Sequence, residues 1–196
     1  MATFLIDLSP RDMQSRLRDA LSVYVGAMRY PHGTEDHRAA MWLEHTHRRG
    51  WRAAAVVEVA NQAGEVAALS SAPLLGIAYG YSGAPDQWWQ QQVVLGLRRS
   101  RAENAEITRL MTSYFELTEL HIHPRAQGRG LGEALTRRLL DGCTEANVLL
   151  STPEIGSETN RAWRLYRRLG FAGILRDHYF TGDPRAFAIL GRPLPL

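Results

Sequence analysis

The sequence predicts an α/β protein whose helices pack on a mixed sheet, in a single domain spanning residues 1–196. Short apolar segments of strand length alternate along the chain with longer amphipathic segments of helical period. The composition, 45% hydrophobic and 22% charged, is typical of a chain that forms a packed core. No internal repeat or shift in composition marks a domain boundary.

The first part of the chain is expected to contain three strands and two helices. Pro10 after Ser9 is typical of a helix start, and the turn at Pro31–Gly33 separates two helical patterns. In order, the sequence predicts strand Phe4–Leu8, helix Pro10–Met28, helix Glu35–Arg49, strand Ala53–Ala60, loop Asn61–Pro73 and strand Leu74–Ser82.

The second part is expected to add three more helices and two strands, and then a hairpin. The predicted elements are helix Asp86–Leu97, a charged connection over Arg98–Glu106, strand Tyr114–His123, a helix carrying Leu131, Ala134, Leu135 and Leu139, strand Val148–Thr152, helix Glu158–Leu169, and hairpin strands Gly173–Phe180 and Phe187–Leu190. Trp88 and Trp89 point about 100° apart on a helix, so both cannot be fully buried. One of them is expected to face a pocket or an interface.

A glycine-rich loop carries the clearest functional signal. The strand Tyr114–His123 leaves through Pro124 into Gln127-Gly128-Arg129-Gly130-Leu131-Gly132, which opens a helix. The first N–H groups of a helix lack intrahelical partners and lie at the positive end of its dipole, and glycines allow a phosphate to approach them. The loop therefore predicts phosphate binding, with a plain structural turn as the alternative.

Two nucleotide-binding patterns can be compared with this loop. A phosphate loop of nucleotide hydrolases would need Lys and then Ser or Thr after the last glycine, and these are absent. The dinucleotide pattern fails because Glu133 stands where its third glycine belongs, although Glu154 lies at roughly the distance of a ribose-binding acid. A nicotinamide enzyme therefore stays open as a minor alternative.

Two signatures in the right order resemble the GNAT superfamily of N-acetyltransferases. The family's cofactor loop has Gln or Arg, two residues, Gly, one residue, and Gly or Ala, which Gln127 to Gly132 match; a register starting at Arg125 also fits but shortens the strand exit. The second signature appears as Ala162, Leu165-Tyr166 and Gly170-Phe171. The resemblance covers about residues 114–171.

The resemblance implies a mostly antiparallel central sheet flanked by helices and acetyl-CoA as cosubstrate. It also implies that the strand end pairs with the pantetheine arm and polarises the thioester carbonyl. The implied cofactor-binding residues are His121, Ile122, His123, Gln127, Gly128, Arg129, Gly130, Leu131, Gly132, Glu133 and Asn160. Asn160 lies one residue from the family's usual asparagine position, which is Thr159 here.

Two further expectations follow from the resemblance. The strands Leu74–Ser82 and Tyr114–His123 are usually joined by a short turn, so the helical segment with the two tryptophans is expected to be an insertion between the third and fourth strands. The family's strand position for a general base falls on Glu116, with Glu119 as the neighbour that a β-bulge could bring to the same face. Tyr166 takes the family's role of proton donor to the departing thiolate.

The predicted reaction is direct acetyl transfer to an amine of a protein or small molecule, because Cys143 lies beyond the loop helix and not at the thioester. An alkylamine is mostly protonated at neutral pH, so a base must remove a proton first. The alternative is a catalytically idle acyl-CoA-binding or regulatory module. The acceptor, the preferred acyl chain and the choice between monomer and homodimer stay open.

Other classes of function find little support. The net charge of +3 is spread along the chain without an aromatic and basic motif, so no nucleic-acid partner is expected. His121 and His123 could form a metal pair, but no third ligand is suggested and no metal is expected. The absence of a long apolar segment and of a signal-like N-terminus predicts a cytoplasmic protein without a membrane partner.

Overall fold

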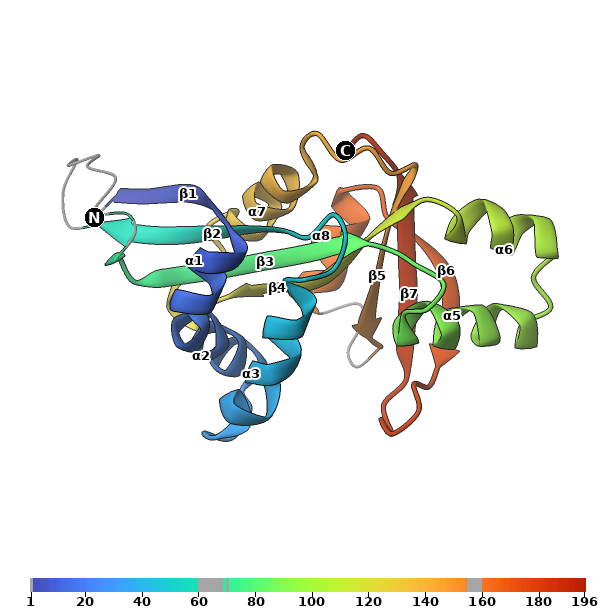
Figure 1. Ribbon diagram of the computed structural model, residues 1–196, viewed down its shortest axis with the longest axis horizontal. Coiled ribbons are helices and arrows are strands. Elements are labelled where there is room, and N and C mark those ends of the chain that lie inside the picture. Colours follow the sequence, from blue (N-terminus) through green and yellow to red (C-terminus); the bar gives the residue numbers. More distant parts are fainter. Residues whose placement is uncertain (1, 60–68, 70, 155–159) are drawn as a thin grey trace. The chain divides into compact units, whose positions relative to one another are not determined.

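The computed structural model of the chain describes residues 2–59, 69, 71–154 and 160–196 (Figure 1). The first elements are β1 (Ala2–Leu8), α1 (Pro10–Ser15), α2 (Leu17–Met28), α3 (Thr34–His45), β2 (Arg52–Val59) and β3 (Leu74–Ser82). They are followed by α5 (Trp88–Arg99), α6 (Asn104–Met111), β4 (Tyr114–Ile122), the 3₁₀ helix η1 (Pro124–Ala126), α7 (Leu131–Leu140), β5 (Asn147–Pro153), α8 (Arg161–Arg168), β6 (Ala172–His178) and β7 (Phe187–Pro193).

The strands of the described chain form a seven-stranded sheet in the order β1-β2-β3-β4-β5-β7-β6. Neighbouring strands are antiparallel in the pairs β1/β2, β2/β3, β5/β7 and β6/β7, and parallel in β4/β5. The predicted α/β fold with a mixed, mostly antiparallel sheet is therefore confirmed, as is the final hairpin of β6 and β7.

The chain divides into two compact units. Unit 1 comprises Met1–Tyr81 and Thr118–Asp141, and unit 2 comprises Ser82–Leu117 and Gly142–Leu196. The start of β4 belongs to unit 2 and its end, with the glycine loop, to unit 1. The prediction that residues 1–196 form a single domain stays a prediction.

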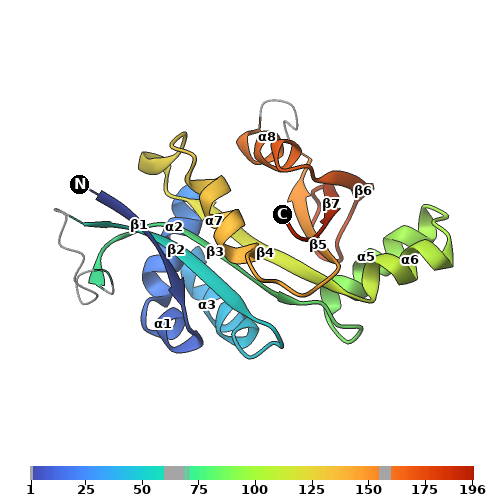
Figure 2. The same ribbon diagram turned by 90° about the horizontal axis from the view of Figure 1, so that it is seen from above.

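Unit 1 has helices on both faces of its strands. Alternate residues of β2, Ala53, Ala55 and Val57, join the core made with α1, α2 and α3. The residues between them, Ala54 and Val56, are also buried and face the side of α7. Figure 2 shows α1 and α3 on one side of these strands and α7 on the other.

The predicted helix Pro10–Met28 is wrong in one respect, because the structure has two helices there. Ser9 and Asp12 form a capping box that starts α1. The helix breaks at Arg16, which has φ −110° and ψ 15°. Arg16 is buried, and its guanidinium donates to the Ala72 carbonyl and contacts Asp19. The break thus coincides with an arginine whose polar head is bound inside unit 1.

Unit 2 has a core between its strands and the helices α5 and α6. Trp89, Leu110 and Met111 pack there with Leu149 and Ile189 of β5 and β7. The charged connection predicted over Arg98–Glu106 was too long, because α6 begins at Asn104 and buries Ile107. The charged residues at the start of α6 obscured the amphipathic pattern that follows them in the sequence.

The two tryptophans differ in burial, as the sequence predicted. Trp89 is buried, and its Nε1 donates to Ser151 Oγ at 3.3 Å. Trp88 is 51% exposed, and its ring lies 5.5 Å from that of Phe180. α5 and α6 do lie between the third and fourth strands of the chain.

Some predicted features fall outside the described residues. These are most of the loop Asn61–Pro73, the start of the helix at Glu158, and Thr159. Within the ranges that the structure does describe, no helix is both long and apolar enough to cross a bilayer.

Candidate active site

The end of β4 turns sharply into the glycine loop within unit 1. His123 follows β4, and its Nδ1 accepts a hydrogen bond from the Arg125 N–H at 3.3 Å, which starts η1. Gln127 then folds back, and its Nε2 donates to the Ile122 carbonyl at 3.0 Å. The first residue of the predicted motif therefore fixes the loop to the strand end.

The backbone conformation of the loop depends on Gly128 and Gly130. Their φ angles are +81° and +77°, which is the left-handed region, and an added Cβ at either position would meet no atom within 4 Å. The backbone conformation, more than a lack of space, is what requires glycine here. The open space above both residues also leaves their backbone accessible to a ligand.

The helix α7 starts without a side-chain cap. Gly130 is its N-cap, and the Ala134 N–H to Gly130 carbonyl bond, 3.1 Å, is its first turn. The N–H groups of Leu131 and Gly132 precede this bond, so the helix itself offers them no acceptor. Such a start at the positive end of a helix dipole favours an anion.

Two arginines flank the loop. Arg125 Nη1 lies 2.7 Å from Glu58 Oε2, and Arg129 Nη1 lies 3.8 Å from Glu58 Oε1. The Glu58 carboxylate on β2 is nearly buried, whereas both arginine side chains are about half exposed. One carboxylate thus holds two guanidinium groups beside the loop, which leaves a net positive charge there.

The residues present fit the diphosphate of coenzyme A. A bare helix start, two glycines with open space above them, and a fixed positive charge are the features that a pyrophosphate requires. Glu133 is less suited to direct contact, because its carboxylate accepts from Arg137 Nε at 3.1 Å and Nη2 at 3.0 Å.

The backbone at the end of β4 already makes hydrogen bonds to β3. The His123 N–H donates to the Leu75 carbonyl of β3 at 2.8 Å. Backbone groups of a strand alternate in direction, so those of His121 also point toward β3 and those of Ile122 point away. Ile122 is therefore the residue of this predicted trio whose N–H points away from β3.

The other predicted site residues lie in unit 2. Glu116 on β4 is 3% exposed, and Tyr166 on α8 is buried with its ring 5.5 Å from Phe171. Asn160 is the N-cap of α8, and its Oδ1 accepts from the Ala162 N–H at 2.9 Å. The structure thus gathers the loop residues in unit 1 and the two catalytic candidates in unit 2, and their roles stay predictions.

Glu119 and His121 of unit 1 form a contact that the sequence analysis did not predict. His121 Nε2 lies 2.5 Å from Glu119 Oε2, and both side chains are largely buried. The Tyr24 ring of α2 packs edge-on against the imidazole at 4.9 Å. Residues two apart on a strand share a face, and this signal could have indicated the pair.

Two titratable groups near this pair are neutral at physiological pH. Burial, more than the neighbouring charges, raises the pKa of Tyr24 to about 12. Burial and the Arg48 guanidinium lower the pKa of His45 to about 4. His45 Nδ1 lies 3.0 Å from the Tyr79 hydroxyl, so its buried ring has a polar partner.

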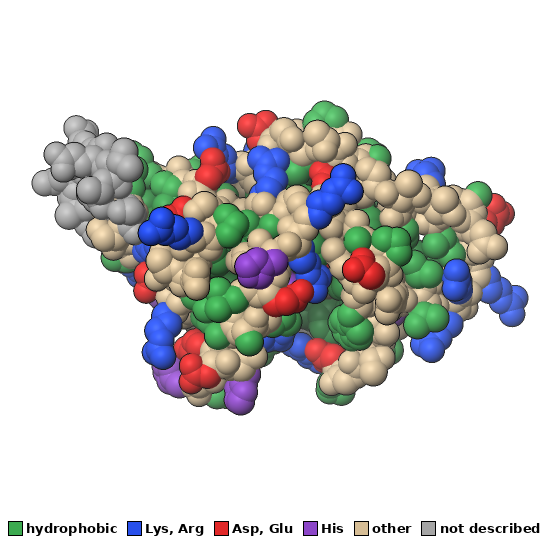
Figure 3. Space-filling model, in the orientation of Figure 1, with side chains coloured by type: hydrophobic (Ala, Val, Ile, Leu, Met, Phe, Trp, Pro, Cys, Tyr) green, Lys and Arg blue, Asp and Glu red, His purple; other side chains and the backbone are tan. Residues whose placement is uncertain are grey.

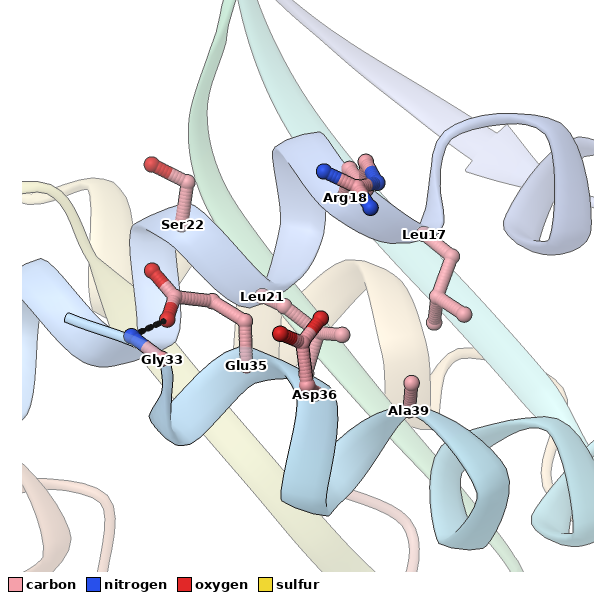
Figure 4. Close-up of a pocket in the computed structure, with 8 residues that line it drawn as sticks. All are labelled: Leu17, Arg18, Leu21, Ser22, Gly33, Glu35, Asp36 and Ala39. Atoms are coloured by element: carbon pink, nitrogen blue, oxygen red, sulfur yellow. Dashed lines mark hydrogen bonds between the residues drawn. The ribbon is translucent and has the colours of Figure 1, made fainter.

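The structure also contains a pocket between α2 and α3, of about 460 Å³ (Figure 4). It is lined by Leu17, Arg18, Leu21, Ser22, Gly33, Glu35, Asp36 and Ala39. Glu35 Oε2 accepts from the Gly33 N–H at 2.8 Å, which is the dashed line in Figure 4. None of the predicted site residues lines it. Among the described residues, no three His, Cys, Asp or Glu side chains gather as metal ligands would.

The fold and the loop define a class of protein, the α/β transferases that hold an acyl-CoA at a helix start. The profile of the acetyltransferase (GNAT) domain matches residues 88–172. A GCN5-like protein acetyltransferase of Mycobacterium tuberculosis is 69% identical over 100% of both chains. The chain belongs to the GNAT acetyltransferase family.

Solved structures agree in fold. The ribosomal-protein-S18-alanine N-acetyltransferase from Escherichia coli has a TM-score of 0.59 and 18% identity, covering 100% of this chain and 96% of that chain. A phosphinothricin acetyltransferase from Sinorhizobium meliloti in complex with acetyl-CoA has a TM-score of 0.57 and 19% identity, covering 99% and 89%.

Proposed function

We propose that this protein transfers an acetyl group from acetyl-CoA directly to an amine. The observation that supports this best is the start of α7, where Gly128 and Gly130 leave an uncapped helix end open to a phosphate. The M. tuberculosis relative is described as a protein acetyltransferase, which favours an amine of a protein over that of a small molecule.

The diphosphate of the cosubstrate would be held by groups of unit 1. The N–H groups of Gly128 to Gly132 would bind the diphosphate, Arg125 and Arg129 would add positive charge, and the Ile122 N–H would face the pantetheine arm or the thioester. Asn160, which already caps α8, would contact the cosubstrate through its remaining amide group.

Acetyl-CoA supplies an acetyl group activated as a thioester. This chain's residues must then remove a proton from the acceptor ammonium and stabilise the departing thiolate. Glu116 and Glu119 are the two candidates for the base that the sequence predicts, and the Tyr166 hydroxyl is the proposed proton donor. The proposed transfer is direct and uses no acyl-cysteine, because Cys143 lies beyond the far end of α7.

The test is an acceptor screen with thiol release as the readout. Lysine-containing peptides, peptides with free N-termini, arylamines and small amines would each be offered with acetyl-CoA and with longer acyl-CoAs. Acceptor-dependent release of coenzyme A, with a mass gain of one acetyl group on the acceptor, supports the proposal. Binding of acetyl-CoA without turnover on any acceptor would support the idle acyl-CoA-binding module instead.

A further inference from the structure

The contact between Glu119 and His121 determines which ring nitrogen carries the proton. An ionised carboxylate can only accept hydrogen bonds, so the neutral imidazole must present an N–H at Nε2, which lies 2.5 Å from Glu119 Oε2. The other nitrogen, Nδ1, then carries a lone pair. In the part of the chain that the structure describes, no hydrogen bond to His121 Nδ1 is found.

We propose that His121, oriented by Glu119, is the general base that takes the proton from the acceptor ammonium. The inference rests on the proposed acetyl transfer and deepens it by naming the base. His121 is the last residue but one of β4, and it belongs to the same unit as the glycine loop that would hold the cosubstrate. Glu119 acts through the ring and is a positioning residue.

The surroundings of the pair support a base at this position. Tyr24 of α2 contacts the His121 ring, and the Glu119 charge acts on the pKa of Tyr24 and on that of His45 of α3. Tyr24 and His45 are neutral near pH 7, because the pKa of the first is raised and that of the second is lowered. The Arg38 guanidinium lies 5.7 Å from the centre of the Tyr24 ring and is directed to that ring.

The pair also suits the chemistry better than a carboxylate alone. An imidazole ordinarily exchanges its proton between pH 5 and 8, whereas a carboxylate does so below about pH 5. Efficient general bases have a proton affinity near the working pH. Glu116, by comparison, is only 3% exposed.

The acceptor ammonium gives one proton to His121 Nδ1, and its nitrogen lone pair then forms the N–C bond while the C–S bond breaks. The nitrogen loses a second proton as it becomes an amide, and the thiolate gains one through the Tyr166 hydroxyl. The imidazolium releases its proton to solvent, so one proton is released in each turnover.

The first test compares the pH dependence of kcat at saturating acceptor for the parent, His121→Gln and Glu119→Gln. His121→Gln should lower kcat roughly 10²- to 10⁴-fold and remove the rise of kcat between pH 5 and 8. Glu119→Gln should lower kcat less and leave acetyl-CoA affinity unchanged. His47→Gln, an exposed histidine of the same unit, is the matched control and should behave as the parent.

The second test does not need turnover. A long-range ¹H–¹⁵N NMR spectrum of the protein without acetyl-CoA should show neutral His121 with its proton on Nε2, and Glu119→Gln should change this tautomer. A proton on Nδ1 at the pH of maximal turnover would overturn the inference. It would also fail if His121→Gln kept the parent's kcat and pH profile while Glu116→Gln lost activity. Absence of acetyl transfer by the parent itself would refute the proposed function instead.

Discussion

At the scale of single residues, several of the predicted site residues make hydrogen bonds that shape the loop and the helix start. Asn160 caps α8, Gln127 fixes the loop to Ile122, and Glu58 holds Arg125 beside the loop. Tyr166 is buried on α8, and its proposed role depends on its hydroxyl group.

Tyr166→Phe keeps the aromatic ring and its contact with Phe171, so acetyl-CoA affinity should change little. If the hydroxyl donates to the departing thiolate, kcat should fall roughly 10- to 1000-fold. Steady-state kinetics with the acceptor found in the screen, beside thermal unfolding, measure both effects. A variant with the parent's kcat would mean that Tyr166 is only a core aromatic residue.

His45 should make the stability of the protein depend on pH. Its folded pKa of about 4 lies below the ordinary 6.5, so the unfolded chain binds more protons in that interval. The free energy of unfolding should therefore fall as the pH falls from about 6.5 to about 4, by on the order of 2–3 kcal/mol.

Urea unfolding at several pH values would measure this effect. His45→Gln should reduce the slope, because it removes the titrating ring, whereas His47→Gln should keep it because His47 is exposed. Equal slopes in the parent and in His45→Gln would show that other groups cause the loss of stability.

At the scale of elements, the strands were predicted closely because their apolar runs end at Pro, Gly or Asn. Leu74–Ser82 was predicted with its observed limits, and β4 differs by one residue at His123. The helices were less predictable. Neither the break at Arg16 nor the start of α6 at Asn104 has a strong local signal, since both depend on tertiary contacts of Arg16 and Ile107.

The features of the candidate site also differ in how well the sequence predicts them. The glycine loop was predictable because positive φ and an open helix start both require glycine, and they leave a pattern in the sequence. The contact of His121 with Tyr24 could not be predicted from the sequence, because these residues lie on a strand and a helix far apart in the chain.

The two tryptophans of α5 give a prediction at this scale. Trp89→Ala should cost about 3–5 kcal/mol of stability, because it empties a buried site and removes the bond to Ser151. Trp88→Ala should cost about 1 kcal/mol, mainly its contact with Phe180. Figure 3 shows several hydrophobic side chains on the molecular surface.

If exposed Trp88 borders the acceptor or a second copy of the chain, its loss should change the acceptor KM or the oligomeric state instead. Kinetics and analytical ultracentrifugation of both variants would decide this. Unchanged KM and unchanged mass for Trp88→Ala would make it an isolated surface residue.

At the scale of the whole molecule, acetyl-CoA should raise the melting temperature, because a ligand that binds the folded state stabilises it by mass action. The gain is about 2.7 kcal/mol at a ligand concentration 100 times Kd. Gly130→Val should abolish the shift, since a β-branched residue cannot easily adopt φ +77° and the loop must change.

Gly182→Val is the matched control, because Gly182 has φ +88° and equally open space but lies between β6 and β7. It should lower the melting temperature of the free protein while keeping the shift with acetyl-CoA. Loss of the shift in both variants would mean that the effect reports general distortion, and a shift with NADH in place of acetyl-CoA would contradict the proposed cosubstrate.

The division of the chain into units has a consequence for synthesis on the ribosome. The chain passes from one unit to the other after Tyr81, Leu117 and Asp141, so neither unit is a continuous stretch. A nascent chain that ends at Leu117 carries all of β1, β2 and β3 but not α7, and the buried Ala54 and Val56 then lack their cover. Until residue 141 has emerged, this apolar surface is a target for chaperones, and no single cut could divide the gene into two independently folding halves.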